Sequence, residues 1–569
     1  MRVLATAGHV DHGKSTLVKA LTGTNPDRWV EEQQRGLTID LGFAHLDTPD
    51  GQRISFIDVP GHIRYLGNML AGVGGINGCL FVVDANEGWM PQTEEHLRIL
   101  HLTAAPAGVI ALTKADLCDA DHLELATLEV IDRVEGTFLE GATIVPVSAT
   151  TGSGMNELVD ALSELARSTP ASVDRGRPRL FVDRVFAAKG SGTVVTGTLR
   201  DGSFAVGDHV VVGSRRSEAR IRGIQTLGES VERIAPGHRV ALNLAGVDHR
   251  ELQRGDCVVA PGRWFHSDRV DARLHVLGSL GHKVSRRGAY TVHVGSDEIP
   301  ARLRVIGPES VEPGATAFVR LHLDRAVPLL PHDHFILRES GRSETVGGGE
   351  ILDVNPRRPA SRATPDADWR RVVAERGVVD VDELELLTGE SVAPTIGTWV
   401  IDETRFVGLR EAVDSRVRTA GADGIDVAVF DDIERAIIDG LDEVTIDNGR
   451  ARLRGTSDPL LEHPSIERLR LEGCAPTAPT GVGGADLRRL AKLGVLFERD
   501  GEWFHVDALE TARSRAHGLL IAHPDGFTLS QFRDALGITR KHAVPLATEL
   551  DARGITRRRG DVRIAGPRL

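Results

Sequence analysis

The chain has 569 residues, of which 41% are hydrophobic and 26% are charged, with a formal net charge of -13. This length exceeds one ordinary core, so three to five domains are expected, and no apolar run approaches the ~20 residues of a membrane span. Four separated cysteines form no C-x-x-C pair, which disfavours zinc. With no signal-peptide pattern at the N-terminus, they predict a cytoplasmic protein.

Charge is distributed unevenly along the chain. Residues 511–569 hold 11 Lys and Arg against 5 Asp and Glu, so this segment carries +6 and the remainder carries -19. A solvated basic face explains such a segment, and so does a surface that binds a polyanion. Composition leaves both interpretations open.

The first predicted elements are a buried strand, RVLATA, and a helix, STLVKALTG, with GHVDHGKS between them. This loop fits G-x-x-x-x-G-K-[ST] in the strand–loop–helix context of a P-loop. Backbone N–H groups would hold phosphates, Lys14 would reach the β and γ phosphates, and Ser15 would bind Mg²⁺. A glycine-rich turn that caps a helix is the alternative. The expected nucleotide-binding residues here are Asp11, His12, Gly13, Lys14, Ser15 and Thr16.

Motifs at later strand ends predict guanine rather than adenine. In FIDVPGH, Asp58 would hold Mg²⁺ through water and the Gly61 N–H would sense the γ phosphate. In ALTKAD, Lys114 would cover the base, and Asp116 would accept from guanine N1–H and N2–H, a donor pair that adenine lacks. Each motif alone also fits a surface segment, but their order after a P-loop favours GTP and GDP as ligands. VPVSAT would offer a backbone N–H to guanine O6, with contacts from Ser148 and Ala149.

GHVDHGKS, RGLTID, DVPGH, TKAD and SAT together resemble the motifs of the translational GTPases, the family of elongation factor Tu. The resemblance implies that Thr38 closes over Mg²⁺ and the γ phosphate. It also implies that His62 is catalytic and orients the attacking water behind an apolar gate of Val10 and Ile39. From the residues alone, Thr38 also fits a strand cap and His62 an exposed histidine. The implied Mg²⁺ ligands are Ser15, Thr38 and Asp58.

One position departs from the family's N-K-x-D motif, because Thr113 stands where the family has asparagine. That asparagine hydrogen-bonds guanine N7 and braces the P-loop, and a threonine hydroxyl is shorter. Guanine selectivity is therefore expected to be retained and to rest mainly on Asp116.

Two regions of short strand patterns follow the predicted GTPase domain, residues 1–170. The first, residues 171–263, opens with RLFVDRVFAAKGSGTVVTGTL, and the second, residues 264–357, contains YTVHVG and ATAFVRLHL. No long helical pattern interrupts either region, so both are predicted to be β-barrels. They resemble the second and third domains of elongation factor Tu, yet more than 200 residues follow them.

That extension, together with RGLTIDLGF, FIDVPGH and LAGVGGI, resembles the bacterial selenocysteine-specific elongation factors over essentially the whole chain. The resemblance implies that the protein delivers selenocysteyl-tRNA to the ribosome at recoded UGA codons and binds an mRNA hairpin through the extension. We expect a monomer with no membrane partner. The alternatives are a general aminoacyl- or initiator-tRNA carrier and a GTP-controlled nucleic-acid-binding regulator.

The family's aminoacyl pocket lies between the GTPase domain and the first barrel. A selenol is far more acidic than a thiol and is an anion at neutral pH, so a permanently charged arginine can select it over serine. The resemblance places Arg184 and Arg239 there, with Asp183 positioning Arg184 or meeting the α-amino group. Alternatively, each arginine pairs with a carboxylate on a barrel surface.

Short hairpin signals recur in residues 358–569, near Asp402, at Asn448-Gly449, at Asp500-Gly501 and near Gly560. Helical patterns precede them, so we predict four winged-helix (α+β) modules in tandem, the last spanning about 508–569. A single α+β domain with scattered hairpins is the alternative.

The last module shows helix-turn-helix order, FTLSQFRDALG followed by TRKHAVPLATELDARG. Its second helix and its wing would contact the phosphate backbone of the mRNA hairpin. Pro545 interrupts the second helical pattern, so that helix either begins later, near Ala543, or is kinked. The expected RNA contacts are Arg540, Lys541, His542, Arg557, Arg558 and Arg559.

Overall fold

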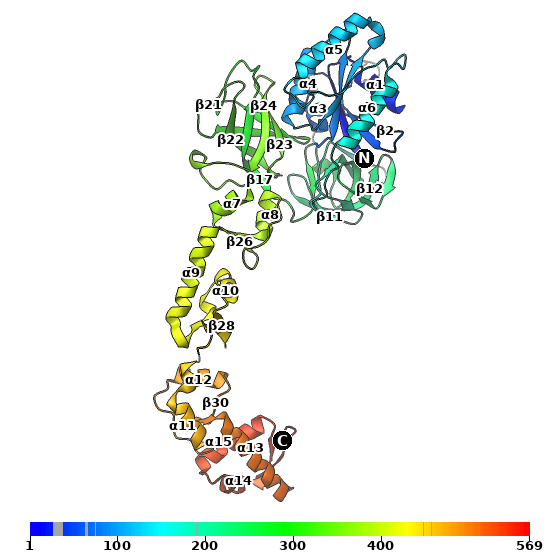
Figure 1. Ribbon diagram of the computed structural model, residues 1–569. Helices are drawn as coiled ribbons and strands as arrows, with labels where there is room; N and C mark the ends of the chain where they lie inside the picture. Colours follow the sequence, from blue (N-terminus) through cyan, green and yellow to red (C-terminus); the bar gives the residue numbers. More distant parts are fainter. Residues whose placement is uncertain (27–37, 63–65, 74, 189–191, 448, 457) are drawn as a thin grey trace. The chain divides into compact units, whose positions relative to one another are not determined.

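The computed structural model describes residues 1–26, 38–62, 66–73, 75–188, 192–447, 449–456 and 458–569. They form two compact units, Met1–Ala393 and Pro394–Leu569. An α/β domain, two β-barrels and helix-plus-hairpin modules follow one another along the chain (Figure 1), which confirms the predicted multidomain fold class. No helix among these residues is long and apolar enough to cross a membrane, and all four cysteines are free thiols.

The α/β domain is built on a six-stranded sheet of order β2-β3-β1-β4-β5-β6, in which only β2 runs antiparallel to its neighbour. Helices α3, α4 and α5 cover one face, and α1 and α6 cover the other (Figure 1). The strands are β1 Arg2–Ala7, β2 Gly42–Asp47, β3 Arg53–Asp58, β4 Gly78–Asp84, β5 Gly108–Thr113 and β6 Ile144–Pro146. The helices are α1 Lys14–Thr22, α3 Leu66–Val73, α4 Pro91–Leu102, α5 Ala120–Val134 and α6 Met155–Ser168.

The central strands of this sheet are mostly apolar because both of their faces are covered. Every residue of β4 and β5 is buried, and both strands are rich in Val, Leu and other apolar residues, as doubly covered parallel strands are. Parallel strands end at one edge, so the loops that follow β1, β3 and β5 meet there. The P-loop, the DVPGH segment and the TKAD segment therefore share one edge of the sheet.

The first barrel closes through the ring β11-β16-β7-β9-β15-β12, with β12 pairing back onto β11. Alternate residues of its strands point inward, as in β15, and build one apolar core. Its strands are β7 Arg179–Phe181, β8 Arg184–Ala188, β9 Gly192–Arg200, β10 Phe204–Ala205, β11 His209–Val212, β12 Ser217–Thr226, β13 Glu229–Val231, β14 Arg233–Ile234, β15 His238–Ala245 and β16 Cys257–Val259.

The second barrel is a closed ring of order β17-β22-β20-β19-β23-β24. In β20, buried and exposed residues alternate strictly, which is the pattern of a strand with one wet face. The strands of this region are β17 His266–Val276, β18 Val284–Ser285, β19 Tyr290–Val294, β20 Asp297–Val305, β21 Ser310–Val311, β22 Thr316–Pro328, β23 His334–Glu339 and β24 Glu344–Asp353.

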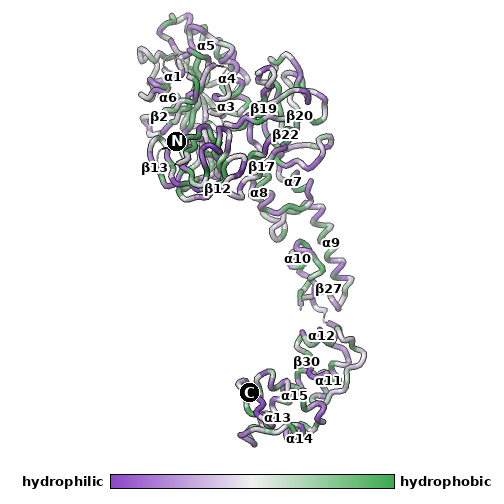
Figure 2. The backbone as a smooth tube through the Cα atoms, turned by 180° about the vertical axis from the view of Figure 1, so that it is seen from behind, coloured by the Kyte–Doolittle hydropathy of each residue, from purple (hydrophilic) through white to green (hydrophobic). Residues whose placement is uncertain are grey.

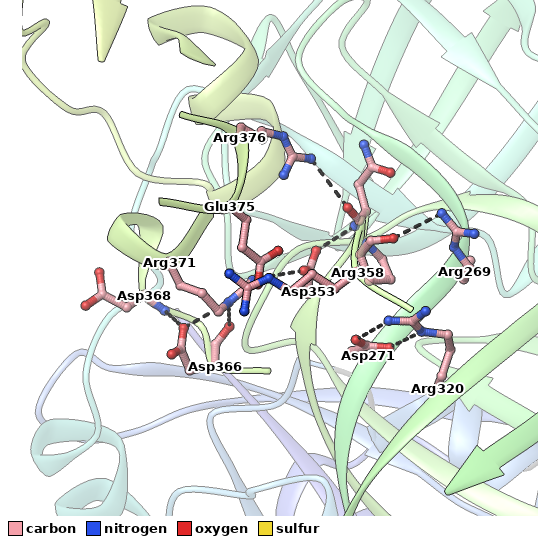
Figure 3. Close-up of polar contacts among 12 residues, drawn as sticks. Arg269, Asp271, Arg320, Asp353, Arg358, Asp366, Asp368, Arg371, Glu375 and Arg376 are labelled. Atoms are coloured by element: carbon pink, nitrogen blue, oxygen red, sulfur yellow. Dashed lines mark hydrogen bonds and ion pairs between the residues drawn. The ribbon is translucent and has the colours of Figure 1, made fainter. Parts of the chain in front are cut away.

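A buried ionic network docks helix α7, Trp369–Arg376, onto the second barrel (Figure 3). Arg371 lies 2.9 Å from Asp353 at the end of β24 and 3.1 Å from Glu375 on its own helix. Beside it, Arg320 of β22 donates two hydrogen bonds to Asp271 of β17, at 2.6 and 2.8 Å. The first compact unit consequently continues past the boundary expected at residue 357, through α7, β25 Val378–Asp380 and α8 Val381–Thr388.

Three modules of helices followed by a two-stranded hairpin lie within the described part of the second unit. Their elements are β26 Trp399–Ile401, α9 Glu403–Ala420, β27 Ile425–Asp426, α10 Asp432–Asp439, β28 Val444–Asp447, β29 Arg450–Leu453, α11 Pro464–Glu472, α12 Gly484–Lys492, β30 Leu496–Arg499, β31 Glu502–His505, α13 Val506–Ala522, β32 Phe527–Thr528, α14 Leu529–Leu536, α15 Arg540–Ala552, β33 Thr556–Arg559 and β34 Val562–Ala565. Hydrophobic and hydrophilic residues interchange along their backbone (Figure 2), as elements with one buried face require.

The hairpin predicted near Asp402 was wrong. Asp402 is the N-cap of the long helix α9, and its carboxylate accepts a hydrogen bond from the Arg405 N–H at 3.2 Å. Asp is favoured both in turns and at helix N-caps, so the residue type alone did not distinguish them. Of the other predicted turns, Asn448 lies outside the described residues, and the turns at Asp500-Gly501 and Gly560 join β30 to β31 and β33 to β34.

The last two modules share a single hydrophobic core. Phe497 and Phe504 of the β30–β31 hairpin belong to the same buried cluster as Phe527 and Leu546 of the final module. Two ion pairs join the modules at their surface, Arg499 with Glu549 and Lys541 with Glu502.

Candidate functional site

The P-loop is held by close backbone packing. Gly8 has φ +134°, and a Cβ there would lie 2.1 Å from the Val82 carbonyl oxygen of β4, so only glycine fits. Gly13, with φ +85°, is the N-cap of α1. Lys14 is buried at the helix start, and its ammonium donates to the carbonyls of Gly8 and His9 at 3.0 and 2.6 Å. The loop thus has the expected form of a phosphate cradle at a helix N-terminus.

Three oxygen-bearing side chains meet beside this cradle. Ser15 Oγ donates to Asp58 Oδ2 at 2.6 Å and lies 2.8 Å from Thr38 Oγ1. Asp58 is fully buried and is fixed by the Thr6 hydroxyl, which donates to Oδ1 at 2.6 Å. Two hydroxyls and a carboxylate are the hard oxygen donors that Mg²⁺ takes, so the residues present fit that ion.

Two buried neutral histidines stabilise the loop. His96 of α4 accepts a hydrogen bond from the Gly8 N–H at 3.0 Å, and burial lowers its pKa to about 3. His12 accepts from the Asp84 N–H at 3.2 Å, and burial, with the nearby charges of His9 and Lys14, lowers its pKa to about 4. The His12 ring therefore belongs to the core, and its carbonyl is the part that the loop presents to TKAD.

The TKAD segment keeps the contact with the P-loop that its unusual threonine put in doubt. Thr113 Oγ1 lies 2.7 Å from the His12 carbonyl oxygen and 3.2 Å from that of Val83, so the hydroxyl ties the strand end to the P-loop. Lys114 lies 2.5 Å from the buried Asp84 carboxylate, and Asp116 is exposed. Ser148 is buried with its hydroxyl accepting from the Thr151 N–H, and Ala149 is half-buried beside it.

The DVPGH segment is pressed onto the P-loop. A Cβ at Gly61 would lie 2.5 Å from the Lys14 ammonium and 2.7 Å from the Val10 backbone nitrogen, so no side chain fits there. His62 follows it, and His62, Val10 and Ile39 are all half-buried. The catalytic role of His62 and the apolar gate remain predictions. Residues 35–37 of RGLTID lie outside the described residues.

The structure brings the three predicted cargo residues together between the α/β domain and the first barrel. Arg184 and Arg239 border a cavity of about 370 Å³, whose walls also include Phe43 and Thr196. Asp183 contacts this lining through its ion pair with Arg239. Arg239 donates to Asp183 at 2.5 and 2.8 Å, and its guanidinium lies 3.5 Å from the Phe43 ring centre.

Both arginines have carboxylate partners. Asp183 holds Arg239 rather than Arg184, and Thr196 also donates to it at 2.6 Å. Burial raises the pKa of Asp183, but the charge and hydrogen bonds of Arg239, with the Thr196 hydroxyl, outweigh burial and leave the pKa lowered. Arg184 lies 3.0 Å from the Asp40 carboxylate and donates to the Leu41 carbonyl.

The predicted RNA contacts occupy two exposed ends of the last module. Arg540, Arg557 and Arg559 are exposed and form no ion pair with any residue that the structure describes, whereas Lys541 lies 2.9 Å from Glu502. Arg558 is exposed and donates to the Gly560 carbonyl at 3.2 Å. The His542 ring faces inward, edge-on to Phe504. A nearby arginine that was not predicted as a contact, Arg563, is buried against Asp551.

Pro545 lies inside α15, which begins at Arg540. The late start near Ala543 was therefore wrong.

Several site residues escaped prediction. Thr6 and His96 support the P-loop and the segment beside it, Phe43 and Thr196 line the cavity, and Asp40 pairs with Arg184. Asp40 and Phe43 stand within RGLTIDLGF, but their partners come from another domain, about 140 to 200 residues later, a pairing that no local pattern encodes.

Family models match four parts of the chain. "Elongation factor Tu GTP binding domain" covers residues 1–168, and "Elongation factor Tu domain 2" covers 192–259. "Selenocysteine-specific elongation factor, beta-barrel domain" covers 269–358, and "Elongation factor SelB, winged helix" covers 519–565.

Two curated relatives match nearly the full length of the chain, and a third matches part of it. The chain is 34% identical over 631 residues to a selenocysteine-specific elongation factor of Desulfomicrobium baculatum, with 99% of each chain covered. It is 32% identical to the Escherichia coli (strain K12) factor of the same name, with 98% of each covered. It is also similar to elongation factor Tu 2 of Streptomyces avermitilis, 34% identical over 62% of this chain and 96% of that one.

Solved structures give the same picture. A crystal structure of a bacterial selenocysteine-specific elongation factor matches with a TM-score of 0.71 and 28% identity, covering 99% of both chains. The translation elongation factor SelB of Methanococcus maripaludis, in complex with a GTP analogue, matches with a TM-score of 0.53 and 26% identity, covering 63% of this chain and 80% of that one.

Proposed function

Because the chain belongs to the selenocysteine-specific elongation factors, a family of translational GTPases, we propose that it carries selenocysteyl-tRNA to the ribosome at recoded UGA codons. The observation that carries this proposal is the cavity between the GTPase domain and the first barrel, which two arginines border. GTP hydrolysis after codon matching releases the factor, and the C-terminal modules hold it to an mRNA hairpin.

Each part of the nucleotide site has a proposed task. Mg²⁺, when bound to Ser15, Thr38 and Asp58, neutralises charge on the phosphates of GTP. Lys14 contacts the β and γ phosphates, and the Gly61 N–H senses the γ phosphate. His62 orients the attacking water. The Lys14 ammonium and the Gly61 backbone already lie within contact distance, which supports this assignment.

The guanine base is recognised by Asp116, with Lys114 over the ring and backbone N–H groups of Ser148 and Ala149 at O6. The Thr113 hydroxyl supplies the P-loop brace but is too short to replace the amide contact to N7. Guanine preference is therefore retained through the Asp116 contacts. Isothermal titration with GTP and ATP tests this assignment, and equal affinities would refute it.

Cargo selection uses charge. The selenolate is an anion at neutral pH, while a serine hydroxyl is neutral, so the Arg184 guanidinium discriminates between them without a difference in shape. Arg239 is held in place by the buried Asp183 carboxylate and by packing on Phe43.

The decisive experiment measures filter binding of selenocysteyl-, cysteyl- and seryl-tRNA with GTP. Arg184→Ala removes a charged contact and is expected to weaken selenocysteyl-tRNA binding about 10- to 100-fold, with little effect on seryl-tRNA. Arg250→Ala is the matched control, because Arg250 is an exposed arginine of the same barrel paired with Asp248. Equal losses for both cargoes would refute selection by Arg184, and no preference in the unmodified protein would favour a general aminoacyl-tRNA carrier.

The exposed arginines of the last module support the hairpin proposal. Arg558→Glu is expected to abolish hairpin binding, to leave GTP and tRNA binding intact, and to reduce the salt dependence of any residual binding. The measurement is a titration of the hairpin that follows an in-frame UGA codon, at several salt concentrations. Arg513→Glu, an equal charge change on α13 of the same unit, is the control. Unchanged hairpin affinity of the Arg558 variant would favour the alternative interpretation, in which the basic segment is only a solvated surface.

A further inference from the structure

Each of the two arginines that border the cavity is paired with an aspartate. Arg239 is paired with Asp183, and Arg184 lies 3.0 Å from Asp40. These four groups sum to zero, so the pocket as it stands gives an entering anion no net attraction from them. One of the two aspartate–arginine pairs must separate before a selenolate can contact that arginine.

Asp183 is unlike a partner that separates easily from its arginine. Its carboxylate is almost completely buried, holds Arg239 through two hydrogen bonds and takes a third from Thr196. Releasing Arg239 would leave a buried charge without its partner, which is strongly unfavourable.

Asp40 is the carboxylate that can separate from its arginine, Arg184. It is about a quarter exposed, and it belongs to the GTPase domain rather than to the barrel that carries Arg184. When Asp40 moves away, its carboxylate reaches water and is not stranded in an apolar core. Arg184 keeps its hydrogen bond to the Leu41 carbonyl, so the guanidinium remains positioned at the cavity.

The discrimination that matters most here is selenium against sulfur. The two atoms are similar in size, so an apolar wall separates them poorly. A cysteine thiol has a pKa of about 8.5, but an adjacent unpaired arginine lowers such values to about 3.5–7.5. A pocket with a bare arginine would therefore ionise cysteine and accept it.

We propose that Asp40 is a specificity-determining residue that neutralises Arg184, so that only a cargo side chain already ionised in water displaces it. The selenol meets this condition and the thiol does not. Asp40 thereby sets an acidity threshold between selenocysteine and cysteine. This inference rests on the proposed function for the identity of the cargo and adds the basis on which cysteine is rejected.

Other charged groups near Arg184 do not supply this threshold. His45 of β2 lines the cavity and is unchanged in every variant below, so it does not account for a difference between them. Arg254 interacts with the charges of Asp40, Asp183 and Arg184 while it donates to Asn68 and to the Gly67 carbonyl, and it too is unchanged in every variant.

The test compares the full-length protein with Asp40→Asn and Asp40→Glu, using one tRNA body charged with selenocysteine, cysteine or serine, with GTP and Mg²⁺, from pH 6 to pH 8.5. Asp40→Asn is expected to tighten cysteyl-tRNA binding about tenfold at pH 7.5 and to move its pH midpoint down by about one unit. Seryl-tRNA binding should not change, and Asp40→Glu should retain the rejection of cysteine. Asp248→Asn, which removes a carboxylate from an exposed pair of the same barrel, should resemble the unmodified protein.

Two outcomes would overturn the inference. One is an Asp40→Asn protein that rejects cysteyl-tRNA at every pH as well as the unmodified protein does. The other is an equal change for all three cargoes, which indicates a structural role. Failure of the proposed function is distinguishable, because then the unmodified protein itself would not prefer selenocysteyl-tRNA over seryl-tRNA.

Discussion

Two aspartate–arginine pairs of the first compact unit have almost the same geometry, but the pKa values of their aspartates are shifted in opposite directions. Asp183 and Arg239 face each other at 2.5 and 2.8 Å beside the cavity between the α/β domain and the first barrel, and Asp271 and Arg320 at 2.6 and 2.8 Å beside the α7 network. The pKa of Asp183 is lowered. The pKa of Asp271 is raised, because burial outweighs Arg320 and because the Asp353 carboxylate is close.

The difference shows that the surroundings, and not the pair alone, decide whether the carboxyl pKa is lowered or raised. Asp183 has a hydroxyl donor and a second arginine nearby, and both favour the carboxylate. Asp271 is buried, and it shares the charges of Arg320 and Arg371 with the Asp353 carboxylate in the network of Figure 3. The first arrangement keeps a fixed charge next to a cavity, and the second fastens a helix to a barrel.

Removing the arginine is the largest perturbation of this comparison. Arg239→Met is expected to destabilise the first unit by about 3–5 kcal/mol, because Asp183 remains charged and buried. Arg320→Met should lower the free energy of unfolding by less, because burial already raises the pKa of Asp271 and the carboxyl therefore takes up a proton more readily. Urea unfolding of both variants at pH 7 measures the difference, with Arg250→Met as an exposed control expected within about 0.5 kcal/mol. Equal costs for the two buried pairs would contradict the comparison.

A smaller change should make the two pairs more alike. Thr196→Val removes the hydroxyl that donates to Asp183 at 2.6 Å and keeps the side-chain volume. We expect a loss of about 2 kcal/mol and an upward shift of the Asp183 pKa. Urea unfolding gives the first value, and the carboxyl resonance followed by NMR titration gives the second. A variant with an unmoved Asp183 pKa would show that Arg239 alone sets the charge state.

The smallest effects should appear in the pH dependence of stability. A carboxyl whose folded pKa is lowered contributes stability above its unfolded pKa, about 3.9, and loses it as the pH falls below that value. Asp183→Asn should therefore reduce the fall of the unfolding free energy with decreasing pH below about pH 4. Asp271 has a raised pKa, so its contribution declines as the pH rises above about 3.9, and Asp271→Asn should remove that decline. Unfolding free energies measured from pH 3 to pH 7 check both slopes, and slopes of the same sign would refute the assignment.

The sequence predicted the parts of this molecule that depend on local chemistry. Gly8, Gly13 and Lys14 are confined to a strand–loop–helix motif, and the structure places Ser15 and Asp58 within one hydrogen bond of each other. The barrels followed from strand periodicity, and they are confirmed.

Other parts depend on contacts between distant segments or on residues with two local uses. The Arg184–Asp40 pair joins two domains, so no pattern near either residue encodes it. Asp402 reads as a turn but caps a helix, and Pro545 reads as a helix break but lies inside α15. Tertiary packing resolves the second ambiguity, because α15 buries Leu546 and Leu550 in the shared core despite the proline. At Asp402 the local N-cap hydrogen bond resolves it.

The shared core of the last two modules has a consequence for anyone who wishes to transplant the last module. Phe497 and Phe504 belong to the same buried cluster as Phe527, although helix α13 separates them from Phe527 in the chain. A fragment that starts at residue 508 would leave part of this core behind and expose apolar side chains to water. The last two modules must therefore be transferred together.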